Sequence, residues 1–203
     1  MNKIRVLYAQ LKRRCGRPGG QWSLWCKRPK TLAEKELVII ESILTQRANW
    51  KNVQLAVANL KDAGVLNLGR IAKTDKEKLA LLVRPSGFYQ QKSERLQILA
   101  RFVLNDCGGV QKAVEMPVQE LRQGLLALKG VGPETADDIL LYALEKPVFV
   151  IDEYTRRLAE RLRLDKTGSY HTLQGLFEKS IKRDYRLYQD FHALIVINGK
   201  EKR

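Results

Sequence analysis

The fold of this chain is decided by Leu128-Lys129-Gly130-Val131-Gly132-Pro133-Glu134-Thr135-Ala136-Asp137. Two glycines flank one apolar residue here, and the segments on either side, 118–128 and 133–144, have the apolar period of amphipathic helices. Glycine tolerates a positive φ and a close backbone approach. Proline suits the first turn of a helix, where its missing N–H costs nothing. The stretch therefore predicts two helices joined by a tight turn.

This turn also predicts an anion site. The second helix begins with backbone N–H groups that have no partner within the helix and with the positive end of its dipole, so it can bind a phosphate. Such contacts hold a nucleic acid duplex in place without reading its sequence. A plain turn between two core helices is the alternative interpretation.

The net charge of the chain favours the interpretation of this turn as an anion site. The 203 residues include 37 Lys and Arg against 22 Asp and Glu, and the resulting charge of +15 raises the local concentration of polyanions. No apolar run approaches the roughly 18 residues that a transmembrane helix needs. The basic N-terminus lacks the apolar core of a signal peptide. Nucleic acid is therefore a better expected partner than a membrane.

Cysteine and histidine are scarce. Cys15, Cys26 and Cys107 are odd in number and match no common zinc or disulfide spacing, which favours a reducing cytoplasm. We interpret His171 as a surface residue and His192 as a packed helix residue. These counts argue against a catalytic metal.

Helical period extends over almost every stretch from Thr31 onward, as in 40–44, 96–103 and 139–144. A short helix over 2–13 and an irregular segment precede it. Residues 147–151 are the only strand-like run, and the run is short. The pattern predicts an all-α fold with short connections.

The hairpin and the residues after it resemble the endonuclease III-like superfamily of helix-hairpin-helix DNA glycosylases. The signature of that family is L-x-G-V-G-x-x-T-A, followed by an apolar stretch and an aspartate. The aspartate here is Asp152, which stands 22 residues after Gly130, as in the family. Further matches are 44–46, 87–92 and 191–196, so the resemblance runs from about residue 37 to residue 200.

The resemblance implies two helical domains flanking a DNA-binding cleft. Residues 35–147 would form the domain that ends in the helix-hairpin-helix, and residues 1–34 with 148–203 would form the second. The protein would act as a monomer on double-stranded DNA containing a damaged base. It would be cytoplasmic and nucleoid-associated.

The resemblance also implies that Asp152 is the catalytic carboxylate. Cleavage of an N-glycosidic bond passes through a state with positive charge on C1′ and the ring oxygen. A fixed carboxylate stabilises that charge and can orient or deprotonate the attacking water. Asp152 opens a predicted helix, whose N–H groups would keep it ionised. An ordinary N-cap aspartate is the alternative.

Two positions of the family enter the duplex when the damaged base leaves the stack. They correspond to Gln46 and Phe88, and Phe88 follows a Pro-Ser-Gly turn that suits an apolar wedge. A polar helix end for Gln46 and a core aromatic for Phe88 are the alternatives.

The family binds DNA phosphates through the hairpin. The corresponding residues are Lys129, Gly130, Val131, Gly132, Glu134 and Thr135. The family also implies a structural monovalent cation at the backbone carbonyls of Leu126, Leu128 and Val131, and it requires no other cofactor.

Two departures from the family pattern narrow the subclass. Bifunctional members carry a lysine two residues after the second hairpin glycine, and its amine attacks C1′. That residue is Glu134 here, so we expect a monofunctional enzyme without β-elimination. The four-cysteine iron–sulfur loop of many relatives is missing, since no cysteine follows Cys107. Together with residues 83–89, these departures look like the 3-methyladenine DNA glycosylase branch, which removes alkylated purines.

This branch surrounds its cationic base with aromatic faces, which attract a cation. It carries a pocket aromatic at the position of Trp50, which we expect on the same helical face as Gln46. Trp22 and Trp25 resemble its tryptophan-rich segment, and Lys200 aligns with a C-terminal lysine near the pocket. The alternatives are core packing for the tryptophans and a solvated charge for Lys200.

Other functions share the hairpin. They are a glycosylase for uracil or thymine opposite guanine, an endonuclease III-like glycosylase with lyase activity through another lysine such as Lys129, and a structural DNA-binding protein without catalysis. The presence of Asp152, Gln46 and the aromatic loop argues against the last of these.

Overall fold

All regular secondary structure within residues 2–164 and 168–201, the part that this computed structural model describes, is helical. The all-α prediction is confirmed. The chain divides into two compact units, one of residues 29–144 and one that joins residues 1–28 to residues 145–203. In the same described ranges, no helix is long and apolar enough to cross a membrane.

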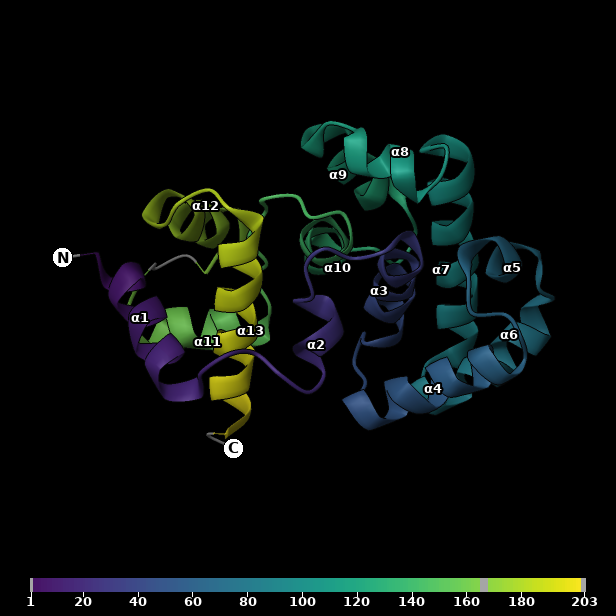
Figure 1. Cartoon of the computed structure of the whole chain (residues 1–203), viewed down its shortest axis with the longest axis horizontal. Helices are drawn as coiled ribbons and strands as arrows, with labels where there is room; N and C mark the ends of the chain where they lie inside the picture. The colour runs from purple at the N-terminus through teal and green to yellow at the C-terminus, as the bar shows by residue number, and fades with distance from the viewer. Residues whose placement is uncertain (1, 165–167, 202–203) are drawn as a thin grey trace. The chain divides into compact units, whose positions relative to one another are not determined.

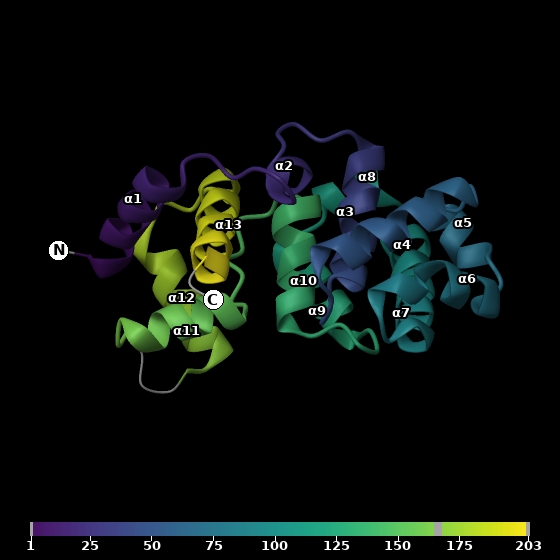
Figure 2. The same cartoon turned by 90° about the horizontal axis from the view of Figure 1, so that it is seen from below.

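Residues 29–144 form a unit of short helices (Figures 1 and 2). These helices are α3 (Leu32–Leu44), α4 (Trp50–Asp62), α5 (Leu68–Lys73), α6 (Lys76–Val83), η1 (Arg84–Ser86), α7 (Tyr89–Arg101), η2 (Phe102–Asp106), α8 (Val110–Glu115), α9 (Val118–Ala127), α10 (Pro133–Asp138) and η3 (Ile139–Ala143). The η3 turn is a π-helix that continues α10 without a break.

Four of these helices begin at a capping side chain. The Thr31 hydroxyl accepts a hydrogen bond from the Glu34 N–H, and the Glu34 carboxylate accepts one from the Thr31 N–H, so a capping box starts α3. Asn49, Asn67 and Asp75 cap α4, α5 and α6. Such caps satisfy N–H groups that have no partner in the helix, and each contributes about 0.5–2 kcal/mol. Local sequence therefore determines where these helices start.

The core of this unit lies on α3 and α7. Ile39, Ile40 and Ile43 are fully buried, and α3 packs against η3 and α7 while α7 packs on α5 and α6. Burying a side chain of this size contributes roughly 1.5–3 kcal/mol. This burial fixes α3 and α7 in place, and with them the residues at the end of α3 and at the start of α7.

The second unit is built around α13 from both ends of the chain (Figures 1 and 2). Its helices are α1 (Lys3–Cys15), α2 (Trp22–Trp25), α11 (Glu153–Arg161), α12 (Tyr170–Ser180) and α13 (Tyr185–Glu201). Phe149, Phe177 and Phe191 are fully buried, with ring centroids 4.6–5.7 Å apart. Aromatic packing of this kind contributes beyond its buried area.

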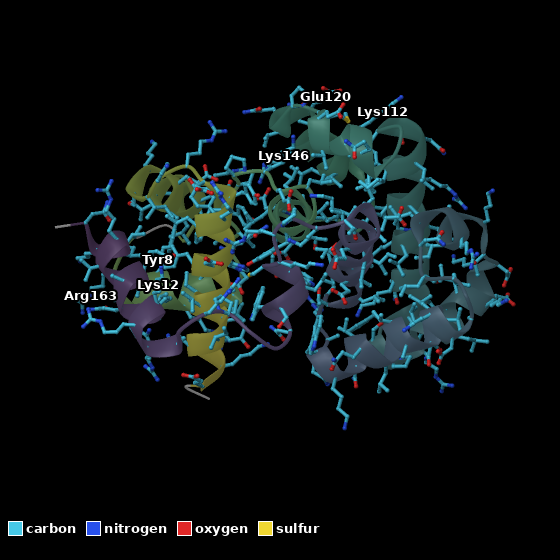
Figure 3. The ribbon with its side chains drawn as sticks, in the orientation of Figure 1. Tyr8, Lys12, Lys112, Glu120, Lys146 and Arg163 are labelled. Atoms are coloured by element: carbon cyan, nitrogen blue, oxygen red, sulfur yellow. The ribbon has the colours of Figure 1, made fainter. Side chains whose placement is uncertain are left out.

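Helix α1 joins this core through an aromatic contact. The Tyr8 ring lies 5.0 Å from Phe191, and the Lys12 ammonium lies 5.9 Å from the Tyr8 ring (Figure 3). Both α1 residues are labelled in the figure. The N-terminal helix is therefore packed on α13.

Residues 147–151, the short strand-like run, contain no regular secondary structure. Their backbone is hydrogen-bonded to α12 instead: Phe149 N–H donates to Glu178 Oε1 at 2.8 Å, and Gln174 Nε2 donates to Phe149 O at 2.7 Å. One local expectation was wrong. The N-terminal segment expected to be irregular contains the short helix α2.

Candidate active site

The glycine turn joins α9 to α10 as the sequence predicts. Gly130 has a φ of +82°, and a Cβ at this position would collide with the Arg95 side chain. Gly132 has a φ of −91° and open space around it. Val131 N–H donates to Leu128 O at 3.1 Å and closes the turn. Gly130 is therefore the position whose conformation and crowding require glycine.

The first turn of α10 begins at Pro133 without a side-chain cap. Gly132 and Glu134 beside it are exposed, while Val131 and Thr135 are buried. An uncapped helix start of this kind can hold an anion.

Lys129 extends from the same turn. Its side chain is 76% exposed, and its ammonium lies 2.9 Å from Glu94 Oε1. An exposed pair of this kind contributes little free energy, so the ammonium is easily released to another anion.

Gln46 is hydrogen-bonded to the glycine turn and to α10. Its Nε2 donates to Gly130 O at 3.1 Å and to Thr135 Oγ1 at 3.0 Å, while Arg95 Nη1 donates to its Oε1 at 2.6 Å. Gln46 follows the end of α3, where it is half-buried. The structure thus brings this residue and the hairpin together.

Phe88 lies on the surface rather than in the core. The residue is 56% exposed and adopts the left-handed conformation, with φ +47° and ψ +34°, immediately before α7. Gly87 before it has a φ of +71°. The turn therefore presents an apolar ring to solvent, and the core interpretation of this aromatic is wrong.

Trp50 does not share a helical face with Gln46. Helix α3 ends at Leu44, a turn with Arg47 at φ +51° follows, and Trp50 is the first residue of α4. The expected common face is wrong because the Asn49 cap starts a new helix. Trp50 is half-buried.

Asp152 caps α11 in the unit formed by the two ends of the chain. Its Oδ1 accepts a hydrogen bond from Thr155 N–H at 2.7 Å, and its Oδ2 lies 3.6 Å from His192 Nε2. The side chain is 13% exposed. The N-cap alternative is thus correct for one oxygen, while the other faces an imidazole.

These neighbours set the charge of Asp152. Burial raises the pKa of this carboxyl, but the attraction to His192 and the hydrogen bond from Thr155 outweigh burial, so the pKa lies below its ordinary value of 3.8. The carboxylate is therefore ionised at neutral pH.

Aromatic rings enclose His192. The Trp22 ring meets it edge-on at 6.0 Å and meets Trp25 edge-on at 5.9 Å. Trp22 and Trp25 are 6% and 5% exposed, so packing occupies most of their surface. The expectation of a packed helix position for His192 fits its 3% exposure, but its neighbours give it a further role.

Lys200 contacts the residue that precedes Trp22. Its ammonium donates to Gln21 Oε1 at 3.1 Å. Burial lowers the pKa of Lys200, while the charge of Asp152 acts in the opposite direction. The structure therefore brings Asp152, His192 and Trp22 together, and sequence reasoning missed the place of His192 in this group.

In the described ranges no cluster of three or more His, Cys, Asp or Glu could hold a metal ion. The carbonyls of Leu126 and Leu128 lie at the end of α9, where carbonyls lack partners within the helix, although that of Leu128 accepts the Val131 N–H. Neutral oxygen donors of this kind suit an alkali cation.

Comparison with known proteins identifies the class. Residues 40–183 match the HhH-GPD superfamily of base excision DNA repair proteins. The chain belongs to this superfamily, so the helix-hairpin-helix fold and the DNA glycosylase family expected from the sequence are confirmed.

Individual relatives agree with this assignment. A candidate DNA repair glycosylase of Methanocaldococcus jannaschii is 40% identical over 167 residues, which cover 81% of this chain and 76% of that protein. Endonuclease III of Thermotoga maritima is 29% identical over 147 residues, covering 72% and 65%. The crystal structure of H. pylori 3-methyladenine DNA glycosylase bound to 1,N6-ethenoadenine superposes with a TM-score of 0.81 at 30% identity, covering 100% of this chain and 99% of that one.

Proposed function

We propose that this protein is a monofunctional DNA glycosylase that hydrolyses the N-glycosidic bond of alkylated purines in double-stranded DNA, of the 3-methyladenine and 7-methylguanine type. The observation that carries the proposal is the ionised carboxylate of Asp152, which is fixed by Thr155 and lies beside His192 and, through it, Trp22. Similarity to the H. pylori 3-methyladenine DNA glycosylase supports the class of lesion.

Asp152 acts on the sugar of the everted nucleotide. As the C1′–N bond breaks, its electron pair leaves with the base, and positive charge develops on C1′ and the ring oxygen. A preorganised carboxylate stabilises that charge. Water then bonds to C1′, and its proton passes to the carboxylate or to solvent. Because an alkylated purine is cationic in DNA, it leaves as a neutral base without needing a protonating acid.

Aromatic groups select the base in this proposal. Trp22, Trp25 and Trp50 would supply ring faces that attract a cationic purine, and Lys200 would border the pocket. Because Trp22 and Trp25 are nearly covered by packing, their contact with a base is limited to the small area left exposed.

The hairpin holds the DNA backbone. Lys129, the turn from Gly130 to Gly132, and the start of α10 at Glu134 and Thr135 would bind phosphate through N–H groups and the ammonium. A monovalent cation at the carbonyls of Leu126, Leu128 and Val131 would add positive charge there. Gln46 and Phe88 would fill the space that the everted nucleotide leaves.

Glu134 supports hydrolysis alone. It is exposed on the first turn of α10, at the position where a lyase needs an amine. A carboxylate cannot form a Schiff base with C1′, so strand cleavage by β-elimination has no nucleophile there. Borohydride should therefore trap no covalent complex with DNA.

The proposal is tested with a panel of matched duplexes containing 3-methyladenine, 7-methylguanine or uracil, and a duplex with an adenine mispair. Released bases are resolved by chromatography. We expect release of the alkylated purines and intact strands without alkali. Release of uracil or adenine alone would replace the proposed lesion class, and borohydride trapping would show a lyase.

A further inference from the structure

Lys92 is a charged side chain in the core of the unit of residues 29–144. The residue is 1% exposed, and burial, together with the charge of Arg95, lowers the pKa of Lys92 to about 8. Burying an ammonium costs free energy unless hydrogen bonds compensate for lost water. Its Nζ donates to Leu44 O at 2.8 Å and to Ser86 O at 2.7 Å.

The two accepting carbonyls stand just before the proposed gap-filling residues. Leu44 is the last residue of α3 and precedes Gln46 by two positions; Ser86 is the last residue of η1 and precedes Phe88 by two. Carbonyls at a helix end lack partners within the helix. One ammonium thus satisfies both and joins the two segments that lead into the duplex.

A second side chain of α7 acts on the same segments. Arg95 lies three residues after Lys92, so both side chains share a helix face, and Arg95 donates to Gln46 Oε1 at 2.6 Å. The backbone N–H of Lys92 donates to Phe88 O at 2.9 Å. Helix α7 therefore contacts both gap-filling residues or the peptides before them.

We propose that Lys92 is a positioning residue that sets the spacing between Gln46 and Phe88, so that both side chains enter the duplex together. The inference rests on the gap-filling roles proposed above. Methionine at position 92 would retain most of the volume but leave two buried carbonyls without a donor. The two segments would then relax independently, whereas the hairpin would bind undamaged duplex as before.

Lys35→Met is the matched control for Lys92→Met. Lys35 is 6% exposed in the same unit and donates to a carbonyl, that of Ala143 at 3.1 Å, which belongs to neither segment. Insertion is followed by fluorescence of 2-aminopurine opposite an uncleavable abasic analogue. Lys92→Met should weaken the insertion signal at least tenfold, with the Kd for undamaged duplex changed less than threefold. Lys35→Met should change both less than threefold, even where its Tm falls.

A double-mutant cycle separates positioning from stability. In a protein that already carries Gln46→Ala and Phe88→Ala, Lys92→Met should change the insertion signal less than twofold. Neither gap-filling side chain is then present to be positioned. Equal costs in both backgrounds, an insertion signal within twofold of wild type, or a tenfold loss in Lys35→Met would overturn the proposal. Should Lys92→Met lack a cooperative unfolding transition, Lys92→Gln takes its place with the same expected comparison.

The abasic probe keeps this test independent of the lesion. A wild-type protein that inserts into the abasic duplex but releases no alkylated purine contradicts the proposed function, while the Lys92 comparison is still measured. A protein that releases alkylated purines with unaltered insertion in Lys92→Met contradicts the inference alone.

Discussion

Asp152 is the residue whose ionisation should govern activity. Its pKa lies below 3.8, so we expect the single-turnover rate of base release to show no appreciable loss from this group between pH 8 and pH 5. The rate should fall only as the pH drops through the folded pKa. The stability that this carboxylate contributes has the same sign: it is present above the unfolded pKa of about 3.9 and is lost on acidification. A fall in the rate near neutral pH that is seen in wild type but absent from Asp152→Asn would contradict this.

His192 should keep the acid limb of the pH–rate profile at low pH, because it lowers the pKa of Asp152. In His192→Leu the attraction at 3.6 Å is lost, burial then dominates, and the pKa of Asp152 rises. The acid limb of the rate profile should move to higher pH, with the rate on its plateau reduced. His171→Leu is the control, because this exposed histidine lies against Tyr170 instead. An unmoved limb in His192→Leu would show that the imidazole is mere packing.

Among the elements, the glycine turn is the most sensitive to substitution. Gly130→Ala forces a side chain to φ +82° and into Arg95, which must release Gln46. The left-handed conformation alone costs about 1–2 kcal/mol, so thermal unfolding should show a clear drop in Tm. The matched variant Gly132→Ala has room and an ordinary φ, and its Tm should stay close to wild type. Equal Tm values for the two variants would refute this account of the turn.

Elements with local signals could be predicted from the sequence. The hairpin helices followed from apolar period, two glycines and Pro133. The break between Gln46 and Trp50 has a local signal in Asn49, a strong N-cap residue that caps α4. The strand-like run at 147–151 is decided by side chains of α12, and only tertiary structure brings these to its backbone.

Contacts between distant residues could not be predicted. His192 lies 40 positions after Asp152, and Arg95 lies 49 after Gln46. Neither pair has a periodic or capping signature, because side chains on separate helices meet only through packing. The resemblance named Asp152 and Gln46 but gave no partner for either.

At the scale of the whole molecule, the charge of +15 should appear in the salt dependence of DNA binding. Each phosphate contact contributes about 0.9 to the log–log slope of affinity against salt. Lys129→Ala should reduce that slope by about one and weaken lesion and undamaged duplexes alike. Glu94→Gln, which frees Lys129 from its 2.9 Å partner, should slightly strengthen both. A change of affinity for the lesion duplex alone would assign Lys129 to recognition of the base.

The central claim is tested most directly by single-turnover release of 3-methyladenine from duplex DNA by wild type and Asp152→Asn. Asparagine keeps the shape and caps helices well, so α11 and duplex binding should persist, with the Kd within a few-fold of wild type. Loss of the negative charge should lower the rate by about 10²-fold or more. A rate for Asp152→Asn within threefold of wild type, with binding intact, would contradict the account.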